Sequence, residues 1–203
     1  MAAESPFPRF VSLACHDLRT PLATVHGFAR TLERIEPLSE RTLTYVGMIE
    51  AASAEMVVLL DALALAARIE GGRYEPALVE ADSLELVRTA AERVDAGEVE
   101  IAGTGGEVQV ELEPVTRGVA AFATCALRHG GIDRVSYAVQ GAELRLTPVA
   151  EDVAPILLGD DLRDLGAATA RRVVEALGGS VAVDADALAV RLPTSGAATD
   201  GGP

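Results

Sequence analysis

The sequence predicts an α+β protein in which a helical hairpin forms a dimeric four-helix bundle and is followed by a small α/β sandwich. Residues 8–72 contain two long stretches whose apolar residues alternate at spacings of four and three, which is typical of bundle helices. Beyond residue 72, short β-prone runs alternate with helical segments. We therefore expect two domains, at residues 8–72 and 73–193, and a disordered Gly- and Ala-rich tail at residues 194–203.

The first two helices are predicted to be antiparallel neighbours. The first should cover about residues 8–34, and the break around Pro37 is short. Ser39 suits the N-cap of the second helix, which should cover about residues 40–70 and stop at two glycines. The apolar residues that define these helices, called the predicted rows below, are Leu18, Leu22, Val25, Ala29 and Leu32 on the first and Tyr45, Ile49, Ala52, Met56, Leu59, Leu63 and Ala66 on the second.

A single hairpin buries only one side of each helix, so the remaining apolar surface needs a partner. Two copies packed as a four-helix bundle would cover it, which predicts a homodimer. The alternative is that the second domain covers this surface within one chain.

The second domain is predicted to be a mixture of helices and strands. The run Gly103-Thr104-Gly105-Gly106 lacks a following lysine and falls between two predicted strands, so we interpret it as a turn rather than a phosphate loop. The expected helices are at residues 81–94, 114–128 and 162–177, and the expected strands are at residues 98–102, 107–112, 135–139, 143–147, 180–183 and 187–192.

Composition restricts the function classes. The chain has 203 residues, 49% of them hydrophobic, so a substantial core is expected. A formal charge of −14 argues against nucleic acid or an anionic membrane as a partner, because both require a basic surface. Two distant cysteines make no disulfide framework, and no run resembles a signal peptide or a membrane span. We therefore expect a cytoplasmic protein.

His16 stands in the segment with the most chemical information. A carboxylate that accepts the Nδ1–H of an imidazole raises the basicity of the other nitrogen and fixes the tautomer, and Asp17 could do this. Thr20 follows His16 by one helical turn, so its hydroxyl could orient a water molecule toward a phosphohistidine. Pro21 would remove one backbone hydrogen bond after this turn. The segment therefore suits phosphoryl transfer through His16.

Residues 10–32 resemble the H-box of the dimerisation and histidine-phosphotransfer domain of bacterial sensor histidine kinases, most specifically in the run His-Asp-Leu-Arg-Thr-Pro-Leu at residues 16–22. The resemblance implies that His16 is the phosphoacceptor, that Asp17 assists its phosphorylation and that Thr20 positions water for dephosphorylation of a partner. Arg19 and Pro21 would be supporting residues. It also implies a response-regulator receiver domain as partner.

The remaining histidines, His26 and His129, lack a comparable local group of residues, and we interpret both as structural or solvated. No metal-ligand spacing joins the histidines to Cys15 and Cys125, so no metal site is predicted.

Residues 73–193 resemble the ATP-binding catalytic domain of the same kinases, most closely at residues 167–179. The resemblance implies an α/β sandwich with its helices on one face of a mixed sheet. Cys125 falls where the family has its metal-binding asparagine, and a thiol is a poor ligand for Mg²⁺. Asp152 is the nearest candidate for the adenine-binding aspartate, and Gly166 is a single glycine where the lid has several. We therefore expect a degenerate nucleotide site.

Three functions follow from this combination. The first is a phosphorelay protein that exchanges a phosphoryl group between His16 and the aspartate of a receiver domain, without a cofactor of its own. The second is an active histidine kinase that uses ATP and Mg²⁺ in a divergent site. The third is a non-catalytic dimerisation scaffold, or a receiver phosphatase that acts through Asp17 and Thr20.

Overall fold

The computed structural model describes residues 7–35 and 38–195, in two compact units that meet between Tyr74 and Glu75. The predicted tail lies outside the described residues except for Thr194 and Ser195. Each unit is described by itself below.

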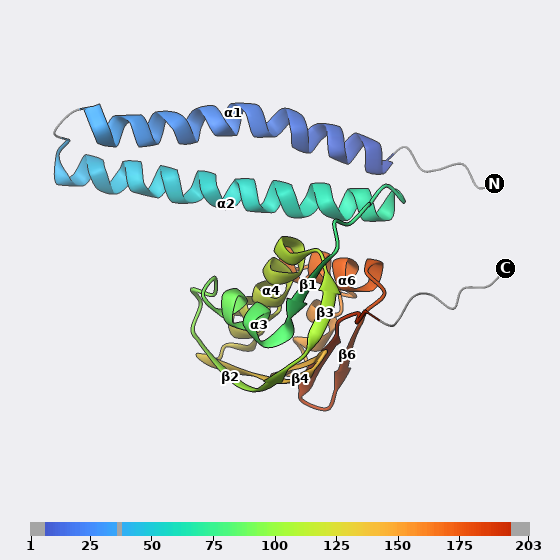
Figure 1. Ribbon diagram of the computed structural model, residues 1–203. Coiled ribbons are helices and arrows are strands. Elements are labelled where there is room, and N and C mark those ends of the chain that lie inside the picture. Colours follow the sequence, from blue (N-terminus) through green and yellow to red (C-terminus); the bar gives the residue numbers. More distant parts are fainter. Residues whose placement is uncertain (1–6, 36–37, 196–203) are drawn as a thin grey trace. The chain divides into compact units, whose positions relative to one another are not determined.

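The first unit is an antiparallel hairpin of two helices, α1 (Phe7–Ile35) and α2 (Glu40–Glu70) (Figure 1). Ser39 caps α2 as predicted, since its side chain accepts a hydrogen bond from the backbone N–H of Thr42. At the other end, the N–H of Gly71 donates to the carbonyl of Ala67. The chain therefore forms the two helices close to the limits expected from its sequence.

Only part of the predicted rows packs between α1 and α2. Leu22 and Ala29 of the first row are buried, but Leu18, Val25 and Leu32 are about half exposed. On α2 the buried side chains are Val46, Ser53 and Ala67, whereas the predicted row is largely exposed. Apolar residues follow both faces of each helix, so spacing alone could not show which face meets the other helix.

Three polar contacts set the register of the hairpin. Arg19 Nη2 donates to Asp61 Oδ1 at 2.6 Å, and His26 Nδ1 lies 3.0 Å from Ser53 Oγ. Farther along, Arg30 Nε lies 3.4 Å from a Glu50 carboxylate oxygen. The partners on α2 come in the reverse order of those on α1, as an antiparallel pair requires. These contacts favour the observed buried face, because packing through the opposite face would separate the paired side chains.

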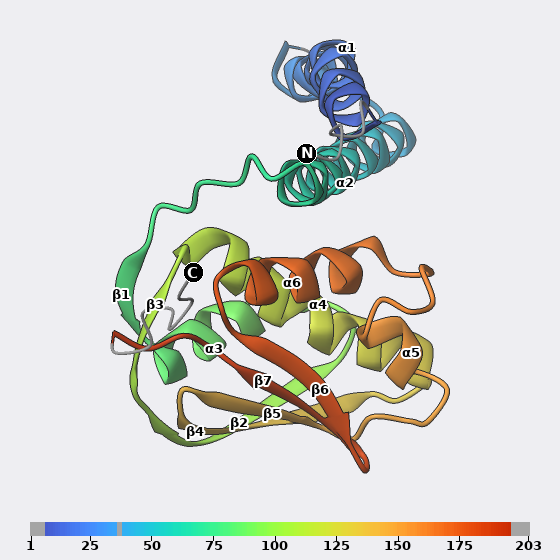
Figure 2. The same cartoon turned by 90° about the vertical axis from the view of Figure 1, so that its right-hand side faces the viewer.

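The second unit is an α/β sandwich. Its sheet has the order β2-β4-β5-β7-β6, in which β2 and β4 are parallel and the other neighbours are antiparallel. Helices cover one face of this sheet (Figure 2). The sheet strands are β2 (Glu98–Gly105), β4 (Arg134–Gly141), β5 (Glu143–Thr147), β6 (Ser180–Asp184) and β7 (Ala187–Arg191), and the helices are α3 (Ser83–Ala91), α4 (Leu112–Gly130), α5 (Ala154–Leu157) and α6 (Leu165–Ala176).

The core of this unit lies between the sheet and α4. Tyr137 of β4 and Phe122 of α4 are among its largest fully buried side chains. The Tyr137 hydroxyl donates to the carbonyl of Val119 at 2.7 Å, so the one polar atom of this side chain is satisfied. Gly118 of α4 approaches α6 so closely that an added Cβ would lie 3.1 Å from the Cβ of Ala170. The helices therefore pack tightly as well as covering the sheet.

Two short elements were not predicted from the sequence. Strand β1 (Val79–Asp82) pairs with β3 (Glu107–Val110) outside the main sheet, and α5 has a single turn. Two helices begin later than expected because an aspartate caps each of them. The side chain of Asp82 accepts from the amides of Leu84 and Glu85 in α3, and that of Asp164 accepts from an amide of α6. The run after residue 102 is the end of β2 rather than a free turn.

Candidate functional site

His16 and Asp17 lie next to each other on the surface of α1. His16 Nδ1 is 3.2 Å from Asp17 Oδ1, and the two side chains are 76% and 69% exposed. A carboxylate at this nitrogen favours the tautomer with the proton on Nδ1 and leaves Nε2 with its lone pair. The geometry therefore presents an open, nucleophilic Nε2 to solvent.

The turn that carries His16 is fixed from its other side. Arg19 forms its short ion pair with Asp61 of α2, and Cys15 is buried. Burial raises the pKa of the Cys15 thiol above its usual value, although the Arg19 guanidinium opposes the shift. Cys15 directly precedes His16 and Arg19 follows it within one helical turn, so their contacts fix the backbone of the turn that carries His16. Cys15 is thus a packing residue beside the site.

Thr20 and Pro21 are both exposed and lie inside the continuous helix α1. At about 100° per residue, Thr20 lies only about 40° from His16 around the axis, so both are on one face. Leu13 shares this face and is 58% exposed. The proline ring has no N–H to give to the carbonyl four residues earlier, which belongs to Asp17. The helix therefore brings His16, Asp17 and Thr20 together at the surface, whereas Arg19 faces Asp61 of α2 and Pro21 is turned by about 140° from His16.

Exposed apolar side chains lie on another side of the hairpin. On each helix, these exposed side chains lie about 100° around the helix axis from the residues packed between the helices. Because the two helices are antiparallel, both sets of exposed side chains face the same side of the hairpin. His16 is about 200° from Leu18, so its face is opposite to theirs. We call these residues the outer rows: Leu18, Val25, Phe28 and Leu32 on α1, and Tyr45, Ile49, Met56, Leu59 and Leu63 on α2.

His26 has the structural role expected of it. The Ser53 hydroxyl donates to the carbonyl of Glu50 at 2.9 Å, so it accepts from His26 Nδ1. This bond lies between the two helices, and Ser53 is fully buried. His26 therefore stabilises the hairpin and is a natural control for His16.

The three nucleotide-site candidates come from different elements of the second unit. Cys125 is fully buried in α4, Asp152 is exposed in the turn before α5, and Gly166 is the second residue of α6. A Cβ added to Gly166 would lie 3.1 Å from the Cβ of Ala121 on α4. Gly166 thus allows two helices to approach, which explains its presence without a nucleotide.

The beginning of α6 is already occupied by a carboxylate. Asp164 Oδ1 accepts from the backbone N–H of Ala167 at 2.8 Å. The N-terminal amides of a helix are the groups that would bind a phosphate, and a side-chain carboxylate there competes with it and repels it. The thiol of Cys125 is likewise a poor ligand for Mg²⁺.

Sequence reasoning missed a grouping of three potential ligands. Cys125, His129 and Asp164 each offer one donor atom, and these atoms all lie within 4.8 Å of one another. His129 Nε2 is 3.6 Å from Asp164 Oδ2. Burial, with the Asp164 carboxylate nearby, raises the pKa of the Cys125 thiol to about 12. The four-residue spacing of Cys125 and His129 on one helix was the only local sign of this grouping. Asp164 is distant in sequence, so no local pattern connects it with the other two.

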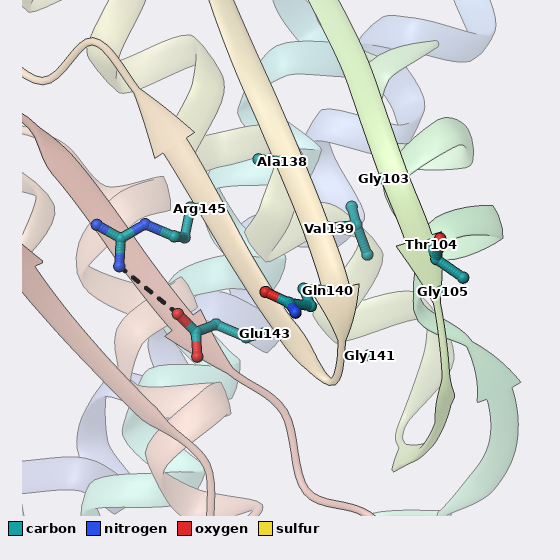
Figure 3. A pocket seen from close by; sticks show the side chains of 9 residues that line it. All are labelled: Gly103, Thr104, Gly105, Ala138, Val139, Gln140, Gly141, Glu143 and Arg145. Atoms are coloured by element: carbon teal, nitrogen blue, oxygen red, sulfur yellow. Dashed lines mark ion pairs between the residues drawn. The ribbon is translucent and has the colours of Figure 1, made fainter.

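A separate hollow lies at the ends of β2, β4 and β5 (Figure 3). Its lining includes Gly103, Thr104 and Gln140, and the ion pair between Arg145 and Glu143, which measures 3.6 Å, lies at one side. None of the candidate residues named above lines it. A Cβ on Gly103 would lie 1.9 Å from the carbonyl oxygen of Val139, so the glycine there serves the pairing of β2 with β4. The hollow adds nothing to the candidate site.

Among the helices in the described part of the chain, none combines the length and the apolar character needed to cross a membrane.

Comparison with known proteins finds a family model that matches the hairpin. Residues 9–72 match the His Kinase A (phospho-acceptor) domain. The sensor protein DivL of Caulobacter vibrioides is 31% identical over 84 residues, which cover 41% of this chain and 11% of DivL. The probable sensor histidine kinase TcrY of Mycobacterium tuberculosis is 27% identical over 113 residues, which cover 56% of this chain and 22% of TcrY. The matches therefore span less than a quarter of each relative.

Solved structures share the fold of both units. The full-length ShkA structure, in complex with AMPPNP, has a TM-score of 0.66 and 23% identity, over 95% of this chain and 47% of that one. The histidine kinase AdeS of Acinetobacter baumannii has a TM-score of 0.55 and 16% identity, over 89% of this chain and 98% of that one. The helical hairpin followed by an α/β sandwich, as expected from the sequence, is therefore confirmed.

Proposed function

We propose, on the premise that this chain belongs to the sensor histidine kinase family, that it is a dimeric phosphorelay protein whose His16 exchanges a phosphoryl group with a receiver aspartate. The observation that carries the proposal is the exposed pair of His16 and Asp17, with 3.2 Å between Nδ1 and Oδ1. Because Nδ1 faces the carboxylate, the free Nε2 is the atom that would carry the phosphoryl group.

The transfer can be written as a balanced exchange between this chain and the receiver domain. The lone pair of Nε2 attacks the phosphorus of the receiver's acyl phosphate, a P–N bond forms, and the P–O bond to the receiver aspartate breaks. The leaving carboxylate needs no proton. Asp17 keeps the Nδ1 proton in place and stabilises the positive charge that develops on the ring. Thr20, on the same face, would orient water for the hydrolytic step.

A receiver aspartyl phosphate is a better candidate donor than ATP. The proposed phosphoacceptor needs a donor. The thiol of Cys125 is a poor ligand for Mg²⁺, and the carboxylate of Asp164 at the start of α6 disfavours a bound phosphate. Asp152, the candidate for the adenine-binding aspartate, is exposed and lies in a turn. We therefore place the phosphoryl source in the partner protein and derive no step from ATP.

The outer rows support the homodimer. They form a long apolar face on one side of the hairpin, and a second copy could cover it by the same face in a four-helix bundle. The face with His16 and Thr20 lies opposite and stays open in such a dimer. The exposed Leu13 on this open face would give the receiver domain an apolar contact.

The experiment is phosphoryl transfer from a panel of receiver domains charged with labelled phosphate. We expect acid-labile label on the wild-type chain, none on His16→Gln, and reduced transfer with Asp17→Asn. His26→Gln is the matched control, because it removes a histidine from the same helix but from its inner face. Transfer to His16→Gln at the wild-type level, or transfer from no receiver, would reject the proposal.

A further inference from the structure

We propose that Cys125, His129 and Asp164 form a binding site for a transition-metal ion of the Zn²⁺ type. The three donor atoms lie within 4.8 Å of one another, although Asp164 comes from α6 and the other two residues from α4. This inference does not depend on the phosphorelay function, because it concerns other residues in the other unit of the chain.

The set of donors selects the class of metal. A thiolate, an imidazole nitrogen and a carboxylate oxygen are common Zn²⁺ ligands, and sites with three protein ligands keep a fourth position for water or another ligand. Mg²⁺ prefers oxygen ligands in an octahedron, which a buried thiol cannot provide. The site would therefore take a soft or borderline ion in the region where the family resemblance had suggested a Mg²⁺ ligand.

The geometry is close to that of a tetrahedral site. With metal–ligand bonds of about 2.0–2.3 Å, the ligand atoms of a tetrahedron are roughly 3.3–3.6 Å apart. His129 Nε2 and Asp164 Oδ2 are 3.6 Å apart, so this edge is already formed. Small side-chain rotations would bring the Cys125 sulfur to the same range from its present limit of 4.8 Å.

The backbone holds the ligands in place. Cys125 and His129 are separated by four residues on one helix, so their side chains share a face of α4. Asp164 is positioned by its capping bond, in which Oδ1 accepts from Ala167 while Oδ2 faces His129. One oxygen can therefore bind an ion while the other still caps α6.

The ion would enter from the side of His129 and Asp164, whose side chains are 28% and 16% exposed, whereas Cys125 is fully buried. Binding breaks the S–H bond of Cys125, forms a sulfur–metal bond and releases the thiol proton to solvent. The ion would offset the negative charge of the thiolate and of Asp164. It would also link α4 to α6 and so stabilise the second unit.

The test is a titration of the full-length, reduced and chelator-treated protein with Co²⁺, followed by displacement with Zn²⁺. We expect one Co²⁺ per chain, with a thiolate-to-cobalt charge-transfer band and the strong visible absorption of a tetrahedral complex. Cys125→Ser should abolish the band, and His129→Gln should weaken Co²⁺ binding by at least about tenfold, a loss that even outer-shell partners of a metal can cause.

Matched variants keep the result interpretable if a substitution impairs folding. Asp164→Asn retains a good capping residue, so it should fold, lose most Co²⁺ affinity and show no stabilisation by Zn²⁺ in thermal unfolding. Cys15→Ser and His26→Gln remove the other thiol and another histidine, and both should keep the band. A folded wild-type chain without the band, or a band that persists in Cys125→Ser, would overturn the proposal.

Discussion

Replacing Ile49 by aspartate should separate the proposed homodimer without unfolding the hairpin. Ile49 belongs to the outer rows and is 47% exposed within one chain. Full burial of an isoleucine contributes about 1.5–3 kcal/mol, so the exposed half has roughly 1 kcal/mol left to contribute at an interface. A twofold dimer contains this residue twice, which gives about 2 kcal/mol.

The introduced carboxylates increase this loss. Burying each without a partner costs at least about 1 kcal/mol, which brings the total to about 4 kcal/mol or more. That change corresponds to roughly a thousandfold increase in the dimer dissociation constant. Within the single chain the same position is half exposed, so the helix should remain folded.

The assay is sedimentation equilibrium over a range of concentrations, with circular dichroism to verify helix content. Val58→Asp is the control, because Val58 is 51% exposed but lies about 180° around α2 from Ile49. We expect a dimeric wild type and control and a monomeric Ile49→Asp. A monomeric wild type, or equal dissociation of both variants, would refute the assignment of the outer rows as the interface.

Three further predictions concern stability. Hydrogen bonds from Arg93, and next from Arg117, lower the folded-state pKa of Glu113 to about 2, so the stabilisation is complete above about pH 4.5 and is lost as pH falls through 2. Glu113 is 55% exposed, so Glu113→Gln should cost less than about 1 kcal/mol in urea unfolding at pH 7. The cost should be smaller at pH 2, where about half of the folded-state carboxyl is protonated, and an equal cost at both pH values would contradict this. Tyr137→Phe removes the buried bond to Val119 and should lower the free energy of unfolding by about 1 kcal/mol, so an unchanged urea midpoint would show that this bond contributes nothing. Arg19→Gln removes the partly exposed ion pair with Asp61 and should cost up to about 1 kcal/mol, and Asp61→Asn in the same background should cost little more if the pair is the cause.

The sequence allowed the prediction of both units because their signals are local. Ser39 carried a cap signal, and alternating patterns marked the strands of the main sheet. The short elements β1 and α5 have only four residues each, and β1 depends on pairing with a strand that lies 25 or more residues later. Such a pairing is decided by tertiary structure and has no local pattern.

The packing of the hairpin and the second candidate site show the same limit. Both faces of α2 are apolar, and the choice between them depends on contacts such as that of Arg19 with Asp61, which are distant in sequence. Cys125 and His129 shared a visible spacing, but Asp164 joins them only because α6 packs against α4. By contrast, His16, Asp17 and Thr20 are close in sequence, so their proximity on α1 follows from helix geometry alone.

The most direct test of the central claim is to label the protein from two donors in parallel. The purified chain and its His16→Gln variant would be incubated with Mg²⁺ and γ-labelled ATP, and separately with a receiver domain that carries labelled aspartyl phosphate. We predict label on His16 from the receiver and none from ATP. Label on His16 from ATP would contradict the account of the nucleotide site, and absence of label from both donors would contradict the assignment of His16 as a phosphoryl carrier.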